Sequence, residues 1–259
     1  MNQIVVTGMI ISTSPIKEYD RRMVILTREQ GKITAFANGA RRPNSPLVAV
    51  VNPFSFGEFT LYEGRTSYTL KSAQISHYFN DLRGDLQGAY YGFYFLEIVD
   101  YFTRESNDEK EMLKLLYLTL KALSNEKISN ALIRNIFELK VLAINGMAPE
   151  VFACLACGNQ EGESYFCVKR GGLVCEGCLP KLTGGGRFKG GDGEFEKMSL
   201  HHSTWYGMQF IIGSKVESLY TFQLSGEVLR EFAEVMRRVY LVHVDKKFNA
   251  LEILNGIGE

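Results

Sequence analysis

Four cysteines in the middle of the chain carry the clearest chemistry in the sequence. Cys154 and Cys157 form one pair and Cys175 and Cys178 a second, in the pattern C-x2-C-x17-C-x2-C. This spacing is typical of a zinc site built from two tight turns, each of which places two thiolates on one side of the metal. Because four thiolates leave no open position for water or substrate, we expect one structural Zn2+ per chain.

The alternatives to a metal site are two disulfides or a redox-active C-x-x-C pair. The segment between the pairs is too short to bury a core, so metal binding would supply most of its folding free energy, on the order of 10 kcal/mol. The fifth cysteine, Cys167, lies within an apolar run and is interpreted as a packed strand residue.

Composition bounds the class of protein. The chain has 259 residues, which is long enough for two domains with a sizeable core. Of these residues 46% are hydrophobic and 22% charged, as in ordinary soluble proteins. No run of about 18 apolar residues predicts a membrane span, and no basic start followed by an apolar stretch predicts a secretion signal. We therefore expect a cytoplasmic protein, in which cysteines stay reduced and disulfides are disfavoured.

Net charge is zero overall but unevenly distributed. Residues 1–80 hold nine lysines and arginines against five acidic residues, whereas residues 81–150 hold eight against eleven. This asymmetry suggests that an anionic partner meets the N-terminal region.

The N-terminal region reads as five short strands within about 75 residues, at 4–11, 23–27, 32–38, 54–62 and 68–74. Glu29-Gln30-Gly31 predicts a hairpin turn between the second and third of them. Because there is no room for crossover helices, the pattern predicts a small barrel of the OB-fold type, with an SH3-like barrel as the rival. We assign residues 1–80 to this nucleic-acid-binding domain.

Cations and one aromatic residue give this barrel its predicted binding surface. In the third strand Ile33, Ala35 and Ala37 occupy alternate positions and are predicted to face the barrel interior. Lys32 and Phe36 share the outer face, where a ring can stack on bases beside a cation, unless the next domain covers Phe36. Arg41 and Arg42 lie in a Gly/Pro/Ser loop, and loops of such barrels commonly contact oligonucleotides. The predicted nucleic-acid-binding residues are Arg21, Arg22, Lys32, Phe36, Arg41 and Arg42.

The rest of the chain is predicted to be helical apart from the cysteine segment. Residues 86–103 are apolar on nearly every face, which predicts a central helix. Apolar residues recur at helical spacing in two further helices before residue 146, the second capped by Ser129. Helices resume near Ser203 and in a long helix capped by Ser225, before a short turn at 248–254. We expect an α-helical domain from residues 81–150 and 195–259. A zinc ribbon with a glycine-rich loop is expected as an insertion at 151–194.

No catalytic constellation is evident. The four histidines lie outside metalloprotease and nucleophile-elbow motifs, and no acidic cluster suggests a two-metal nuclease. We therefore expect a protein that is not an enzyme.

Several stretches together resemble a known family. They are Glu18-Tyr-Asp-Arg21, Thr27-Arg-Glu-Gln-Gly-Lys32, Ala37-Asn-Gly-Ala-Arg-Arg-Pro-Asn-Ser45, Phe137-Glu-Leu-Lys-Val-Leu142, Gly146-Met-Ala-Pro-Glu150, the four cysteines with Gly171-Gly172, and Tyr240–Leu254. In this order they resemble the RecO recombination mediators of bacterial DNA repair. Asn38 departs from a lysine common there, which removes a cation from the predicted loop.

The resemblance implies an N-terminal OB-fold, a helical domain and an inserted zinc ribbon. It also implies binding of single- and double-stranded DNA, annealing of complementary strands and loading of RecA onto strands coated with single-stranded-DNA-binding protein, at the nucleoid. The implied partners are RecR and the acidic, Phe-ended tail of the single-strand-binding protein, for which Arg134 and Lys140 are candidate contacts. The alternative is a zinc-stabilised protein–protein adaptor without direct DNA binding.

Overall fold

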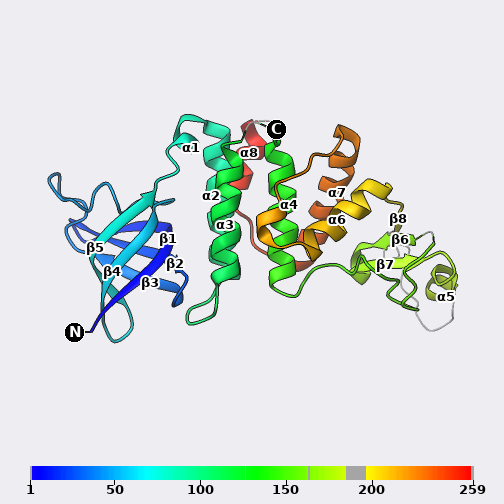
Figure 1. Cartoon of the computed structure of the whole chain (residues 1–259), viewed down its shortest axis with the longest axis horizontal. Coiled ribbons are helices and arrows are strands. Elements are labelled where there is room, and N and C mark those ends of the chain that lie inside the picture. Colours follow the sequence, from blue (N-terminus) through cyan, green and yellow to red (C-terminus); the bar gives the residue numbers. More distant parts are fainter. Residues whose placement is uncertain (1, 126, 163, 185–196, 258–259) are drawn as a thin grey trace. The chain divides into compact units, whose positions relative to one another are not determined.

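The computed structural model describes residues 2–125, 127–162, 164–184 and 197–257. Most of the predicted glycine-rich loop, residues 185–196, lies outside this range. The chain divides into two compact units, residues 1–126 with 247–259 and residues 127–246 (Figure 1). Each unit is described by itself below.

The first unit begins with a five-stranded closed barrel. Its strands are β1 (Gln3–Ile16), β2 (Asp20–Thr27), β3 (Gly31–Ala37), β4 (Phe56–Glu63) and β5 (Tyr68–His77). They are ordered β1-β2-β3-β5-β4, and β1 closes the barrel by pairing with both β2 and β4. The single parallel pair, β3 with β5, completes the topology expected of an OB-fold barrel. The predicted barrel is therefore confirmed.

Alternation along the strands fills the barrel interior. Ile33, Ala35 and Ala37 of β3 are buried in its core, as their spacing predicts. The predicted turn before β3 is also present, because Gly31 has a φ of +63°, a conformation that favours glycine. A Cβ at Gly31 would lie 2.5 Å from the carbonyl oxygen of Asn107, so the close approach excludes a side chain as well.

Four helices complete the first unit: α1 (Asp81–Gly84), α2 (Leu86–Phe102), α3 (Lys110–Leu123) and α8 (Asn249–Ile257). The Asp85 carboxylate caps α2 by accepting hydrogen bonds from the backbone N–H groups of Gln87 and Gly88. Helix α2 packs against α3, α8 and strand β1, which agrees with the central place its apolar residues predict.

The segment predicted as a short C-terminal turn is instead helix α8. Ala250 and Leu254, four residues apart, are both buried, and the helix packs on α2. The backbone N–H of Ala250 also donates to the Glu97 carboxylate. Burial of one helical face is thus the physical reason why this short segment is helical.

The second unit is built around helices α4 (Asn130–Ile144), α6 (His202–Gly213) and α7 (Gly226–His243), with α4 packed against the other two. Ser129 and Ser225 cap α4 and α7 through their hydroxyl oxygens, as the sequence predicts. Gly146, with a φ of +70°, follows the end of α4. Two 3-10 turns lie at Val168–Arg170 and Val216–Ser218.

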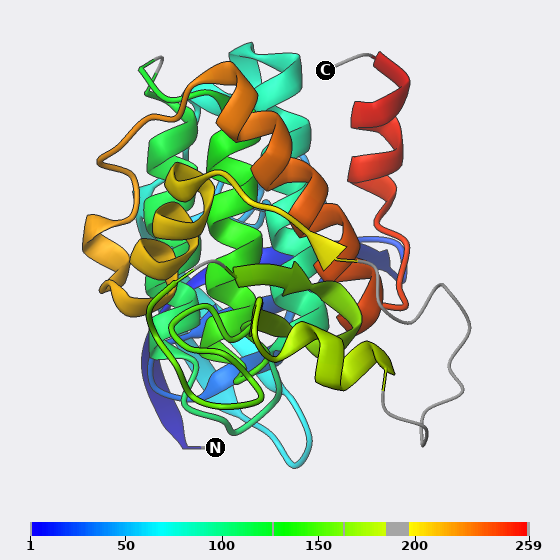
Figure 2. The same cartoon turned by 90° about the vertical axis from the view of Figure 1, so that its right-hand side faces the viewer.

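A small three-stranded sheet is inserted between α4 and α6 (Figure 2). Its strands are β6 (Ser164–Cys167), β7 (Gly172–Cys175) and β8 (Lys197–Met198), in the order β7-β6-β8, and helix α5 (Leu179–Gly184) follows β7. Among the described residues, none of the helices combines the length and apolar character that crossing a bilayer requires.

Candidate metal site and nucleic-acid interface

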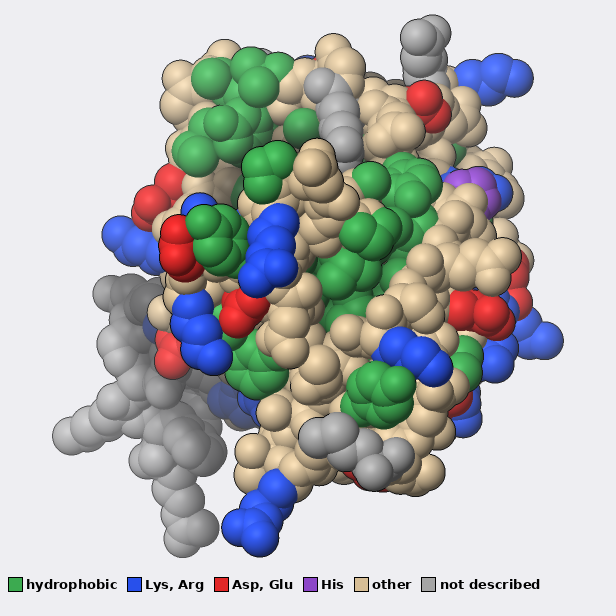
Figure 3. Space-filling view, turned by 90° about the vertical axis from the view of Figure 1, so that its left-hand side faces the viewer, with side chains coloured by type: hydrophobic (Ala, Val, Ile, Leu, Met, Phe, Trp, Pro, Cys, Tyr) green, Lys and Arg blue, Asp and Glu red, His purple; other side chains and the backbone are tan. Residues whose placement is uncertain are grey.

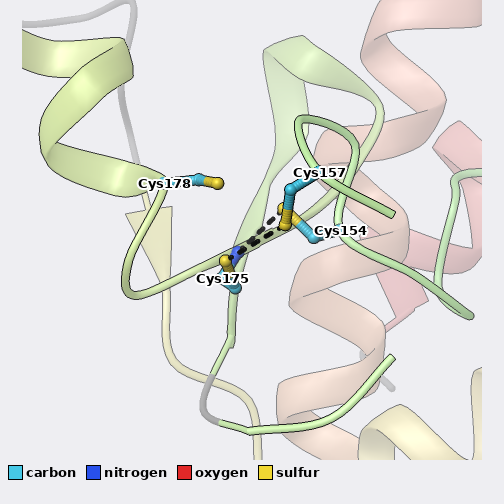
Figure 4. Close-up of side chains that lie close together, drawn as sticks. All are labelled: Cys154, Cys157, Cys175 and Cys178. Carbon is cyan, nitrogen blue, oxygen red and sulfur yellow. Dashed lines mark hydrogen bonds between the residues drawn. The ribbon is translucent and has the colours of Figure 1, made fainter. Parts of the chain in front are cut away.

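The four paired cysteines converge on one point in the second unit (Figure 4). Cys154 and Cys157 come from the loop after α4, Cys175 ends β7, and Cys178 directly precedes α5. Their Sγ atoms all lie within 4.8 Å of one another, and those of Cys157 and Cys175 are 3.7 Å apart. Tetrahedral zinc with bonds of about 2.3 Å requires sulfur separations of about 3.8 Å, so the arrangement fits a metal ion.

Local backbone geometry builds this arrangement. The backbone N–H groups of Ala156 and Cys175 both donate to Cys154 Sγ, at 3.4 and 3.3 Å. Gly158, directly after the first pair, has a φ of +73°, which confirms the tight turn expected there. The Cys178 N–H donates to the carbonyl oxygen of Cys175 and closes the second turn.

These contacts shift the pKa values of two of the thiols in opposite directions. Burial of the Cys154 thiol opposes its ionisation, but N–H donors from Cys175, Ala156 and Cys157 outweigh burial and lower its pKa to about 6. Hydrogen bonding with the Cys157 and Cys175 sulfurs raises the pKa of Cys178 to about 12. The Cys154 thiol therefore ionises more readily than the Cys178 thiol.

The disulfide alternative is not realised, because all five cysteines are free thiols. Cys167 is buried in β6 and packs against Cys154 and Cys178 without joining the ligand cluster, and burial raises its pKa. This placement confirms its interpretation as a packed strand residue.

The cysteine loop is anchored to the rest of its unit by side-chain hydrogen bonds to its backbone and by close backbone packing. The carbonyl oxygen of Val151 accepts hydrogen bonds from Trp205 Nε1 at 2.6 Å and Gln209 Nε2 at 2.7 Å, both on α6. Gly172 approaches Glu150 so closely that a Cβ would lie 2.5 Å from the Glu150 carbonyl oxygen. The ligand loop and the β-ribbon are therefore joined at the base of the metal site.

A second cluster lies on the barrel, where two loops are joined to each other. One is the β1–β2 turn at 17–19, and the other is the segment after β3 that carries Arg41 and Arg42. The backbone N–H of Gly39 donates to Asp20 Oδ1 at 2.8 Å, and that of Arg41 donates to the Tyr19 carbonyl oxygen at 2.9 Å. Arg41 Nη1 also donates to the Glu18 carbonyl oxygen at 3.2 Å.

Two of the six predicted nucleic-acid-binding residues are partly buried and make hydrogen bonds or an ion pair to other elements of the first unit. Arg21 Nη1 donates to the Val51 carbonyl oxygen at 2.7 Å and to Asn52 Oδ1 at 3.1 Å, which fastens the segment between β3 and β4. Lys32 Nζ donates to the Asp100 carbonyl oxygen at 2.6 Å and forms an ion pair with its carboxylate at 3.1 Å. Both side chains thus have structural partners on the barrel or on α2.

Of the other four, the three arginines are exposed and Phe36 is half-buried. Arg41 and Arg42 are exposed, and the Arg42 guanidinium lies 5.4 Å from the centre of the Tyr19 ring. Arg22 is exposed and stands directly opposite Phe36 in the β2–β3 register, while Phe36 itself is half-buried. Cation and ring therefore lie side by side on the outer face of the sheet.

Figure 3 looks onto the barrel side of the first unit. On this face lysine and arginine side chains stand among hydrophobic and a few acidic ones and do not form a single stripe. The basic excess of residues 1–80 therefore does not form one uniformly positive surface on this face.

The two residues suggested for partner-tail contacts lie on α4 in the second unit. Lys140 is 5% exposed, and its Nζ donates to the carbonyl oxygens of Ile212 and Ser214 at the end of α6. Arg134 Nε forms an ion pair with buried Glu138 at 2.8 Å. The Lys140 ammonium thus contributes to joining α4 to α6.

On the barrel, Tyr19 lies beside the exposed arginines but was not among the residues predicted from the sequence. It lies between Glu18 and Asp20 in one of the motifs quoted above, and it is 41% exposed beside Arg42. The sequence does show an aromatic residue between two acidic ones, and this could have marked Tyr19 as exposed. Its proximity to Arg42 could not be predicted, because it depends on the hydrogen bonds that join the two loops.

Comparison with known proteins gives a consistent result over both units. The family described as "Recombination protein O N terminal" matches residues 1–79, and "Recombination protein O C terminal" matches residues 83–252. A protein of Alkaliphilus metalliredigens named DNA repair protein RecO is 31% identical over 96% of this chain and 98% of its own length. Proteins of the same name are 30% identical in Acetivibrio thermocellus, over 99% of this chain and 98% of theirs, and 33% identical in Bacillus subtilis, over 67% and 68%. The two family matches together, and each of the first two relatives, span almost the whole length of the chain, which therefore belongs to the RecO family.

Proposed function

We propose that this protein is a recombination mediator in DNA repair that binds single- and double-stranded DNA and anneals complementary strands. In this proposal it also helps RecA to load onto strands coated with single-stranded-DNA-binding protein, together with RecR. The relatives carry the name DNA repair protein RecO, which supports a role on DNA. The finer steps rest on the family resemblance and on the barrel surface.

The observation that carries the proposal is the pair of joined loops on the barrel. They present Arg41 and Arg42 to solvent on a backbone that donates two hydrogen bonds to the β1–β2 turn and its flank, and Arg41 Nη1 donates a third to the Glu18 carbonyl oxygen. Annealing requires that the charge of two strands be neutralised and involves no covalent step. Preordered arginines supply such neutralisation, because each cation–phosphate contact releases counterions. A non-enzymatic role follows from the same reasoning.

The metal in this proposal is one structural Zn2+ per chain. Four thiolate ligands in tetrahedral reach favour zinc over Mg2+ or Ca2+, which prefer oxygen. Cys154, Cys157, Cys175 and Cys178 would hold it, and it would link the α4 loop, β7 and α5. Its contribution is folding free energy for the ribbon, which has a very small apolar core of its own.

For the tail of the single-strand-binding protein we propose a pocket on the second unit. A largely apolar cavity of about 580 Å3 lies between α6 and the segment before α7, lined by His202, Ser203, Tyr206, Gly207, Phe210, Thr221, Phe222, Gln223 and Leu224. A phenylalanine at the end of an acidic tail is of a suitable size and polarity. Titration of a labelled acidic peptide ending in Phe against wild type and Phe222→Ala tests this, and equal affinity of the two would exclude the pocket.

The decisive experiment is annealing of complementary oligonucleotides by the purified zinc-loaded protein, followed by fluorescence quenching. Annealing well above the spontaneous rate supports the proposal, and adding single-strand-binding protein then tests mediation directly. Absence of annealing together with absence of oligonucleotide binding at low ionic strength would favour the protein–protein adaptor instead. Formation of a cleaved or ligated product that depends on a divalent metal would overturn the non-enzymatic assignment.

A further inference from the structure

The β1–β2 turn places an aromatic side chain at the edge of the predicted DNA surface. Tyr19 is one of the exposed large hydrophobic residues, at 41% of its full accessibility, although a tyrosine in a short turn could fold back onto the barrel. In barrels of this topology the loop between the first two strands commonly contacts oligonucleotides. The exposed Tyr19 ring therefore lies in a loop where such barrels contact oligonucleotides.

The turn is held so that the ring keeps its position. Lys17 has a φ of +48°, an uncommon conformation for a residue other than glycine, which reverses the chain within three residues. The Tyr19 carbonyl oxygen accepts the Arg41 N–H, and the next residue, Asp20, accepts the Gly39 N–H. The Tyr19 backbone is thus tied on its C-terminal side to the arginine-bearing loop.

One cation already lies close to the ring. The Arg42 guanidinium is 5.4 Å from the ring centre, within the range of a cation–π contact. A base stacked on the exposed ring would carry its phosphates past Arg41 and Arg42, both of which are exposed. The arrangement combines a stacking surface with phosphate partners, as single-strand binding sites do.

We infer that Tyr19 is a base-stacking platform that makes the barrel prefer single strands to duplex. The inference rests on the proposed DNA binding and adds a means of discrimination to it. Bases in a duplex are already stacked and paired, so their faces are not free for the ring. Phosphates are present in both forms, so arginine contacts alone cannot distinguish them.

The test compares Tyr19→Leu and Tyr19→Phe in the full-length zinc-loaded protein, by fluorescence anisotropy with a labelled oligo-dT and with a duplex of equal length. We expect Tyr19→Leu to weaken single-strand binding about tenfold, with duplex affinity within twofold of wild type. Tyr19→Phe should retain single-strand affinity, because the ring and not the hydroxyl does the stacking. The salt dependence of Tyr19→Leu should match that of wild type, since no ionic contact is lost.

A second measurement reports the contact directly. Oligonucleotides containing 5-iododeoxyuridine cross-link on irradiation to aromatic residues stacked on the base, and mass spectrometry should locate the adduct at Tyr19. Phe93→Leu is the matched control, because Phe93 is an aromatic residue of similar exposure (42%) on α2 of the same unit, and the affinity of this variant should stay within twofold of wild type.

The outcomes separate this inference from the proposed function. Oligonucleotide binding that Tyr19→Leu leaves within twofold, or a loss equal on single strands and duplex, overturns the stacking role while DNA binding stands. Wild-type protein that binds neither form at low ionic strength overturns both.

Discussion

The four paired cysteines and the six predicted nucleic-acid-binding residues differ in how the fold arranges them. The four cysteines meet as a group, with sulfur atoms within 4.8 Å of one another. The six residues predicted for nucleic acid are instead divided, because Arg21 and Lys32 have partners inside the first unit while Arg41 and Arg42 face solvent. Thiolate clusters need a common centre, whereas a cation can be satisfied by any nearby carbonyl or carboxylate.

The largest expected effect concerns the metal cluster. Cys154→Ser removes a ligand, and because metal binding supplies folding free energy on the order of 10 kcal/mol, we expect loss of bound metal and a much lower melting temperature for the second unit. Elemental analysis and thermal unfolding check this. Whatever soluble protein remains should keep the salt slope of its DNA binding, because that surface lies on the barrel.

Cys167→Ala is the control for that substitution. Cys167 is equally buried but lies outside the ligand cluster, so the variant should still hold one metal per chain. Stable, metal-free wild-type protein with reactive thiols would contradict the role assigned to the cluster.

The next effect tests whether Arg21 is a structural cation. Arg21→Gln removes two hydrogen bonds to the segment between β3 and β4, so we expect the free energy of unfolding to fall by about 1–3 kcal/mol. Denaturant titration measures the change. Arg22→Ala, one position along, should leave stability within about 0.5 kcal/mol, because the Arg22 side chain is exposed. Equal free energies of unfolding for the two variants would contradict the structural role assigned to Arg21.

Arg41→Ala with Arg42→Ala tests the exposed pair. Each lost phosphate contact on a single strand should reduce the slope of log affinity against log salt by about 0.7, so the double variant should lose about 1.4. Arg230→Ala is the comparison, since Arg230 is also exposed but lies on α7 of the other unit, and its salt slope should equal that of wild type. An unchanged slope in the double variant would remove these residues from the interface.

The smallest expected effect is a gain. Asn38 is exposed directly before the joined loop, and Asn38→Lys restores a cation at this position. One additional phosphate contact should strengthen binding a few-fold at low salt and steepen the salt slope by about 0.7. Asn38→Gln should have neither effect, and a lysine variant that behaves like the glutamine variant would place this residue away from the phosphates.

Much of the fold was predictable because it depends on local signals. The alternation of Ile33, Ala35 and Ala37 predicted which side of β3 enters the barrel, and Ser129 and Ser225 marked two helix starts. The prediction of a turn at 248–254 was wrong. The segment is helical because Ala250 and Leu254 are buried where it packs on α2, which lies far earlier in the chain.

The sequence by itself determined the barrel, most of the helices and the cysteine pairs of the candidate metal site, since strand alternation, capping residues and C-x-x-C spacing all act over a few residues. Only the tertiary structure decided which cations remain available. Lys32 is paired with Asp100, 68 residues away, and Tyr19 meets Arg42 because two loops share hydrogen bonds. A charged side chain takes the partner that folding brings near it, and that partner cannot be read from its neighbours in the chain.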